Sequence, residues 1–123
     1  EILTALPTCV ARIAAFVRKS VQIGKSEGVR ICSFGHAGDG NLHIYACQDA
    51  LPEAEWKVKV ARVMDALYRE ARILGGEVSG EHGVGHAKRA YLNQSLGETQ
   101  LALMRGIKAA FDPHGILNPG KVI

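Results

Sequence analysis

The sequence predicts an α+β fold in which helices cover one face of a mainly antiparallel sheet. Two observations carry this prediction. Stretches with apolar residues at helical spacing alternate with short strand-like runs, and the pair Asp39-Gly40 joins two of those runs as a tight hairpin. A chain of 123 residues can bury a core of its own, so we expect residues 1–123 to form a single domain.

Three amphipathic helices are predicted. The first covers residues 7–24, with Pro7 in its first turn. The second covers Glu53–Leu74, and because apolar residues recur along it at helical spacing it should be the longest or second-longest helix. The third covers residues 101–111 and ends at Asp112-Pro113. Together these helices predict one helical layer.

The predicted strands are few and short. Residues 30–36 and 41–47 form the two arms of the hairpin, and Glu77–Ser79 is a candidate for a third strand. His86–Leu92 is a candidate for a brief helix, and Asn118-Pro119-Gly120 has the composition of a turn. The sequence therefore predicts a small sheet of at most three strands.

Composition excludes several classes of protein. Fifteen Lys and Arg residues against twelve Asp and Glu residues leave a net charge of +3, which is too small to indicate nucleic-acid binding. No apolar run reaches the ~18 residues of a membrane span, and no signal peptide opens the chain. Three cysteines without a Cys-x-x-Cys pair argue against a disulfide framework or a zinc ribbon. We therefore expect a cytoplasmic protein, and peripheral association with the inner membrane stays open.

The hairpin carries the first candidate site. If Asp39 and Gly40 are the two turn residues, His36 lies opposite His43 on one face of the sheet. Two imidazoles so placed can bind two positions of one metal ion, or they can simply pack across the hairpin. The same register predicts two further pairs on that face, Phe34 with Tyr45 and Cys32 with Cys47. The other face carries the better core residues, which are Ile31, Leu42, Ile44 and Ala46.

A second glycine-rich segment contributes an acid and a base. Glu81-His82 lies among five glycines between residues 75 and 85. A carboxylate from Glu81 would complete a set of two histidines and one carboxylate with His36 and His43, which is typical of a catalytic metal site. His82 would then stand beside the metal as the general base. A competing interpretation makes His82 and His86, four residues apart, a metal-binding pair on a helix.

Three motifs resemble a known family when they are taken together and in order. They are Gly-His-Ala-Gly-Asp-Gly-Asn-Leu-His at residues 35–43, Ser-Gly-Glu-His-Gly-Val-Gly at residues 79–85, and the tail from Phe111-Asp112-Pro113 to Lys121. This pattern resembles the carboxy-terminal domain of the FAD-linked oxidases, which include the glycolate oxidase catalytic subunit, D-lactate dehydrogenases and D-2-hydroxyglutarate dehydrogenase. The chain also begins with Glu-Ile-Leu rather than Met, so we expect it to be part of a longer protein.

The resemblance implies a ferredoxin-like cap domain over an FAD that a separate amino-terminal domain binds. It implies that His36, His43 and Glu81 hold a divalent metal ion (Zn, Mn or Fe) and that His82 is the base. The tail with Asn118 is similar to a segment that runs back onto the flavin domain, which makes Asn118 a cofactor-binding candidate.

The implied activity is the oxidation of a small 2-hydroxy acid of the glycolate or D-lactate type to the 2-oxo acid. Tyr45 departs from the family pattern, in which several relatives have Asn at this position in contact with substrate. An electron-transfer flavoprotein or an iron–sulfur subunit would reoxidise the flavin, and residues 1–123 alone should be inactive. A metal-binding interaction module and a metal-dependent hydrolase without a redox role remain alternatives.

Overall fold

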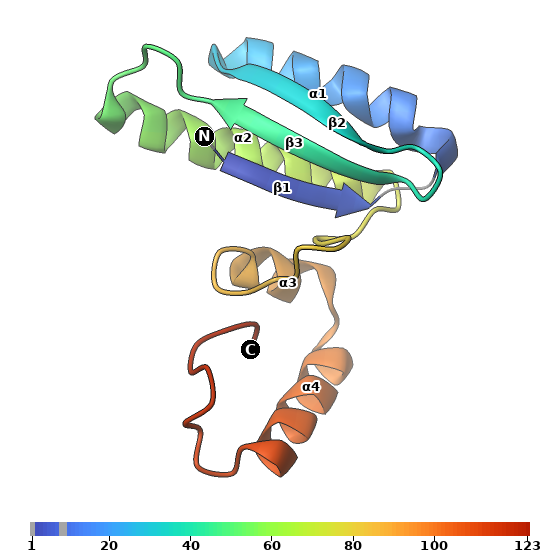
Figure 1. The fold of residues 1–123 in the computed structure, drawn as a ribbon, viewed down its shortest axis with the longest axis vertical. Helices are drawn as coiled ribbons and strands as arrows, with labels where there is room; N and C mark the ends of the chain where they lie inside the picture. Colours follow the sequence, from blue (N-terminus) through green and yellow to red (C-terminus); the bar gives the residue numbers. More distant parts are fainter. Residues whose placement is uncertain (1, 8–9) are drawn as a thin grey trace. The chain divides into compact units, whose positions relative to one another are not determined.

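The computed structural model describes residues 2–7 and 10–123. The chain forms two compact units, Glu1–His82 and Gly83–Ile123. None of the described helices combines the length and the apolar character needed to cross a membrane. In chain order (Figure 1), the elements are β1 (Ile2–Pro7), the 3-10 turn η1 (Val10–Arg12), α1 (Ile13–Glu27), β2 (Arg30–His36), β3 (Asn41–Cys47), α2 (Glu53–Ile73), α3 (Arg89–Ser95) and α4 (Glu98–Phe111).

The strands of the first unit form one antiparallel sheet in the order β1-β3-β2. Helix α1 connects β1 to β2, and α2 follows β3, so these elements make up the βαββα part of a ferredoxin-like fold. Figure 1 shows α1 and α2 on the same face of the sheet. The predicted α+β class, with helices on one face of an antiparallel sheet, is confirmed.

The core of the first unit is built from the helix-facing side of β3 and the apolar stripe of α2. Ile44 and Ala46 are fully buried, as the alternation of the predicted strand requires. Val63 and Leu67 of α2 are fully buried as well, and α2 is the longest helix of the described chain. The opposite face of the sheet carries His36 and His43, whose side chains therefore lie outside this core.

The beginning of the chain differs from its prediction. The helix expected over residues 7–24 begins only at Ile13, and residues 2–7 form the edge strand β1. Pro7 ends this strand, at a sheet edge where a residue without an N–H is tolerated. Pairing with β3, which is distant in the sequence, decides this conformation, and local spacing does not reveal it. The predicted helix end is close to the observed one, since Gly28 caps α1 in a left-handed conformation (φ 65°).

Two short elements are also corrected. Residues 77–79 form no strand, because three residues between flanking glycines offer too short a run to pair. Helix α3 begins at Arg89 rather than His86, and it continues to Ser95. Residues 85–88 form turns, and Lys88, with φ −100° and ψ 4°, is the N-cap that precedes the helix.

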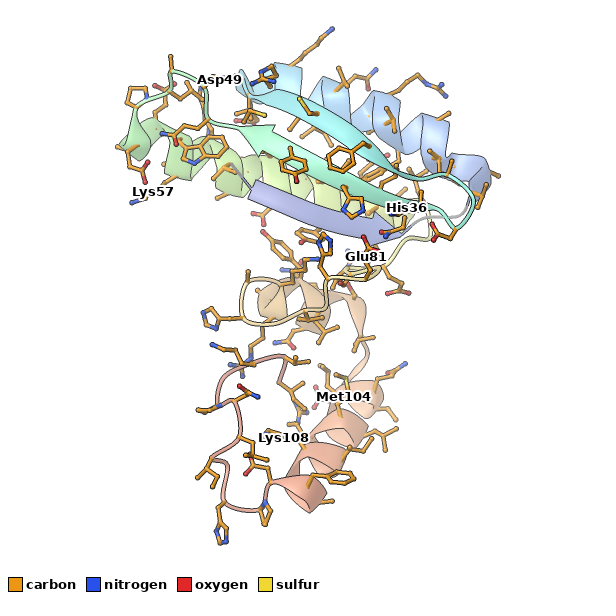
Figure 2. All side chains as sticks on the ribbon, in the orientation of Figure 1. His36, Asp49, Lys57, Glu81, Met104 and Lys108 are labelled. Carbon is orange, nitrogen blue, oxygen red and sulfur yellow. The ribbon has the colours of Figure 1, made fainter. Side chains whose placement is uncertain are left out.

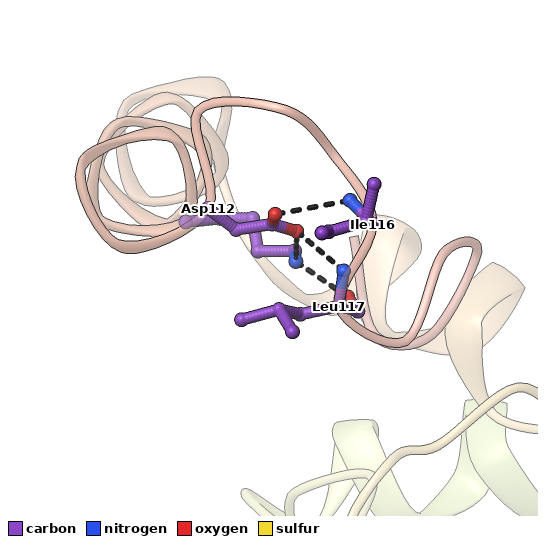
Figure 3. A network of polar contacts seen from close by, with 4 residues as sticks. Asp112, Ile116 and Leu117 are labelled. Atoms are coloured by element: carbon purple, nitrogen blue, oxygen red, sulfur yellow. Dashed lines mark hydrogen bonds and ion pairs between the residues drawn. The ribbon is translucent and has the colours of Figure 1, made fainter.

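In the second unit, α4 ends as predicted at Asp112, whose side chain organises the following turn (Figure 3). Its carboxylate accepts the N–H of Ile116 at 3.0 Å and the N–H of Leu117 at 2.9 Å, and it pairs with the Lys108 ammonium. The Lys108 hydrogen bond, helped by the two backbone N–H groups, lowers the pKa of Asp112. This network ties the end of α4 to the tail.

Asp112→Asn should lower the thermal unfolding temperature by a few degrees at about pH 7 and have much less effect at about pH 3. The pKa of Asp112 is lowered in the folded chain, so its stabilising effect is fully present above the ordinary value of about 3.9 and is lost progressively as the pH falls from there through the lowered folded-state pKa. Thermal unfolding at both pH values measures the difference, with the exposed Glu77→Gln as control. Equal destabilisation at both pH values would contradict this account.

Candidate metal centre

The hairpin that carries the two candidate histidine ligands has a longer turn than predicted. Residues 37–40 lie between the strands as a four-residue loop. The oxygen of His36 accepts the N–H of Gly40 at 3.1 Å, and Oδ1 of Asp39 accepts the N–H of Asn41 at 3.0 Å. The left-handed Gly40 (φ 78°) completes this turn. The Asp39 side chain therefore stabilises a wider loop than the two-residue turn that Asp-Gly predicts.

The wider turn moves the strand register by two residues. His36 lies opposite Asn41, and His43 lies opposite Phe34, so the predicted direct pairing of the two histidines is wrong. A shift of two residues leaves every side chain on its predicted face, and the two imidazole ring centroids are still only 5.7 Å apart. The pairs predicted farther along the hairpin are corrected in the same way, since Cys32 lies opposite Tyr45 and Cys47 lies opposite Arg30.

The segment after α2 brings Glu81 to the two histidines. One ligand atom from each of His36, His43 and Glu81 lies within 4.8 Å of the other two, and Nε2 of His43 is 2.8 Å from Oε1 of Glu81. Figure 2 shows His36 and Glu81 near each other at the hairpin end of the sheet. The structure thus brings together the three residues predicted as metal ligands. Two imidazole nitrogens and a carboxylate oxygen are a donor set that suits Zn²⁺, Mn²⁺ or Fe²⁺.

Aromatic stacking holds one of these ligands in place. The His43 ring stacks on Phe34 with centroids 5.2 Å apart and an interplanar angle of 15°, and Phe34 in turn stacks on Tyr45. The His43 side chain is 8% exposed, whereas that of Glu81 is 45% exposed. His43 is therefore oriented before anything binds, and Glu81 can adjust. The contact of Phe34 with His43 was not predicted, because the predicted register places Phe34 opposite Tyr45.

Asn41 is a second residue that sequence analysis did not single out. It is 6% exposed, and its side-chain oxygen has no hydrogen-bond partner among the described residues. The available signal was a polar residue at the first position of a buried strand, directly after a turn. It lies opposite His36 and two residues before His43 on the same face, so it belongs to the surroundings of the candidate ligands.

His82 lies beside the cluster. Its Nε2 is 3.5 Å from Oε1 of Glu81, and its ring centroid is 4.9 Å from that of His43. The His82 side chain is 39% exposed, so a small molecule can reach it. The alternative in which His82 and His86 share a helix face is wrong, because residues 83–88 form no helix.

The other end of the same sheet face carries an ion pair and two thiols. Nε of Arg30 donates a hydrogen bond to Asp49 at 3.0 Å, which lowers the pKa of the Asp49 carboxyl. A second guanidinium nitrogen of Arg30 lies 3.3 Å from Sγ of Cys32. Cys32 and Cys47 are both free, and burial together with the neighbouring Cys32 thiol raises the pKa of Cys47. Cys9 lies outside the described residues.

Asn118, the cofactor-binding candidate, belongs to the second unit. The predicted turn is confirmed there, since the oxygen of Asn118 accepts the N–H of Lys121 at 3.2 Å. Nδ1 of His86 lies 3.3 Å from the oxygen of Gly120, which holds the tail. Asn118 lines a hollow of about 510 Å³ together with apolar side chains of α4 and the tail. The three candidate metal ligands belong to the first unit.

Fold and site together define an α+β domain that presents two histidines and a glutamate on the sheet face opposite its helices. Residues 4–122 match the family described as FAD linked oxidases, C-terminal domain. Because that match covers nearly the whole chain, the chain belongs to this family. The resemblance inferred from the three sequence motifs is confirmed.

Several relatives carry the names of dehydrogenases or oxidases. The chain is 50% identical over 111 residues to a D-lactate dehydrogenase of Anaerostipes hadrus, covering 90% of this chain and 23% of that protein. It is 41% identical to the glycolate oxidase subunit GlcD of Bacillus subtilis (91% of this chain, 24% of that protein). It is 38% identical to a D-2-hydroxyglutarate dehydrogenase of Stutzerimonas stutzeri (92% and 25%). The chain thus spans about a quarter of the length of these relatives.

Proposed function

We propose that residues 1–123 form the C-terminal cap domain of a longer FAD-dependent oxidoreductase that oxidises a small 2-hydroxy acid to the 2-oxo acid. The observation that carries this proposal is the cluster of His36, His43 and Glu81 with His82 beside it, in a chain of an FAD linked oxidase family. The FAD is held by a separate amino-terminal domain, and when bound it supplies the acceptor for the hydride of the substrate.

His36, His43 and Glu81 hold a divalent metal ion in this proposal. Their ligand atoms lie within 4.8 Å of one another, close enough to share one ion after small side-chain movements. Three protein donors leave coordination positions free, as in catalytic rather than structural metal sites. When bound, such an ion lowers the pKa of a coordinated hydroxyl group and orients the molecule that carries it.

His82 accepts the hydroxyl proton. An imidazole is the commonest general base in enzymes at neutral pH, and this one stands next to Glu81 and His43 while remaining partly exposed. Glu81 also serves His82 as an ion-pair partner at 3.5 Å, so the carboxylate steadies an imidazolium that forms during the reaction. The chain therefore supplies orientation and acid–base chemistry, and the redox step belongs to the flavin.

The second unit faces the flavin domain in this proposal. The hollow lined by Asn118 also includes Ile107 and Phe111, and both side chains are more than half exposed. Exposed apolar surface of this kind is typical of an interface with another protein surface. Asn118 contributes the polar contact on the cofactor side.

The names of three relatives support the proposed substrate class. Their names specify lactate, glycolate and 2-hydroxyglutarate, which are all 2-hydroxy acids. Among these we propose a substrate of the glycolate or D-lactate type, with Tyr45 at the position where this chain departs from the family pattern. An electron-transfer flavoprotein or an iron–sulfur subunit accepts the electrons from the flavin.

Anaerobic mixing of the full-length protein with substrate tests this function. Glycolate or D-lactate should bleach the flavin absorbance and yield glyoxylate or pyruvate, and residues 1–123 alone should do neither because the flavin is missing. A full-length protein without flavin, or a flavin that no 2-hydroxy acid bleaches, would refute the proposal. The chain would then be better explained as a metal-binding interaction module or a metal-dependent hydrolase.

A further inference from the structure

We infer that Asn41 is a positioning residue of the candidate metal centre, because its buried side chain braces Gly80 and thereby sets Glu81 against His43. This inference rests on the proposed function, since it concerns the metal ion that Glu81 is proposed to bind. It assigns a role to a residue that donates no ligand atom to the cluster of His36, His43 and Glu81.

The position of Asn41 is fixed from both sides. β3 is the central strand, and Asn41 is paired with Pro7 of β1 and with His36 of β2. Its backbone N–H is further held by Oδ1 of Asp39 at 3.0 Å. Asn41 is 6% exposed, which leaves its side chain little room to turn away. Such a side chain can serve as a rigid stop for a neighbouring segment.

The neighbouring segment is the one that carries Glu81. A Cβ atom added at Gly80 would overlap Oδ1 and Cγ of Asn41. A side chain at position 80 would therefore force either the buried Asn41 amide or the segment that carries Glu81 to move. Because Gly80 directly precedes Glu81, the contact between Gly80 and Asn41 determines how closely the carboxylate approaches Nε2 of His43, which it reaches at 2.8 Å.

The stability of the fold does not explain why residue 41 is an asparagine. Oδ1 of Asn41 is buried and has no hydrogen-bond partner among the described residues, and a buried unpaired acceptor destabilises a fold. An apolar residue at the first position of a central strand would avoid that cost. A side chain that is unfavourable for the fold, next to a candidate ligand, is consistent with a role in the site.

Titration calorimetry of the full-length protein with Zn²⁺ and Mn²⁺ tests this inference without measuring activity. Gly80→Ala should weaken metal binding by about 10- to 100-fold, the range found when groups that orient metal ligands are altered. Asn41→Ala should weaken it by a smaller factor within that range, and the thermal unfolding temperature of its metal-free form should not fall. The double variant Asn41→Ala/Gly80→Ala should bind metal more tightly than Gly80→Ala alone, because the overlap is removed.

Two control variants match these changes. Gly38→Ala lies in the hairpin loop, where an added Cβ atom meets nothing within 4 Å, and Asn93→Ala lies at an exposed position of α3. Both should bind metal like the wild type. Three outcomes would overturn the inference about Asn41 and leave the proposed metal centre standing. They are additive losses of metal affinity in the double variant, unchanged metal affinity in Gly80→Ala, and a loss of metal affinity in Asn41→Ala that runs parallel to a loss of metal-free stability. A wild-type protein that binds neither ion would overturn the proposed metal centre as well.

Discussion

His82→Ala should lower the turnover number of the full-length enzyme by about 10²- to 10⁴-fold, the usual contribution of a general base. The bound metal should stay near the wild-type amount, because the three proposed ligands are His36, His43 and Glu81. Steady-state kinetics and metal analysis on the same preparation measure both quantities. His114→Ala, at an exposed position of the tail, is the matched control and should change neither.

The result for His82→Ala also decides which of the neighbours Glu81 and His82 is the metal ligand and which is the general base. The Nε2 atom of His82 is 3.5 Å from the Glu81 carboxylate, and its ring lies close to that of His43, so both Glu81 and His82 are near enough to exchange roles. If His82→Ala removes the metal as completely as a change of His43 does, His82 is a ligand and Glu81 becomes the candidate base. We expect the metal to be retained.

His43→Ala should remove metal and activity together. His43 is the most buried of the proposed ligands and is oriented by stacking on Phe34 before anything binds. Its loss should therefore weaken metal binding by more than the roughly 100-fold typical of groups that only orient a ligand. Turnover should fall in proportion to the metal content, and excess metal should restore part of it.

A separate measurement distinguishes loss of the ligand from loss of the fold. His43→Ala also removes a stacked ring from a nearly buried position, so the variant's thermal unfolding should be measured without added metal. Phe34→Leu is a useful companion, because it removes the stacking partner and keeps all proposed ligands. It should weaken metal binding less than His43→Ala. Full metal content with lost activity in His43→Ala would show that His43 is not a ligand.

Local sequence patterns were sufficient to predict the elements that depend on local interactions. The long helix α2 and the two hairpin strands agree with the predicted ranges almost to the residue. The helix is indicated by apolar residues at helical spacing, and the strands are indicated by apolar and polar residues that alternate on either side of a turn. Both patterns are local and do not depend on which other segments the element packs against. The apolar face of β3 was predicted for the same reason, and Ile44 and Ala46 are fully buried.

What the sequence did not reveal depends on contacts between distant segments or on turn geometry. Strand β1 exists because it pairs with β3, and within residues 2–7 no pattern competes with the helical spacing that follows. The hairpin register depended on whether Asp39 sits inside a two-residue turn or caps a four-residue turn with its side chain. Both turns are compatible with the same amino-acid sequence, and only the three-dimensional structure distinguishes them.

The residues that form the candidate site were predicted, but the contacts that support them were not. His36, His43 and Glu81 were named from residue type and from the family resemblance, and they do lie together. The contacts of Phe34 with His43 and of Asn41 with Gly80 follow from the observed register and from the path of the segment after α2. Such supporting contacts have no signature in residue type, because Phe and Asn are common at many unrelated positions.

The four-residue turn between β2 and β3 has a consequence for how this hairpin can vary. His36 and His43 share a sheet face because an even number of residues was added to the predicted turn, and strand side chains alternate with a period of two. Shortening or lengthening the loop by two residues keeps both imidazoles on one side. A change of a single residue, absorbed by a register slip, sends one of them to the helix side, among Ile44 and Ala46. An odd change in loop length keeps both imidazoles on one face only where the loop itself absorbs it and the strand pairing stays as it is.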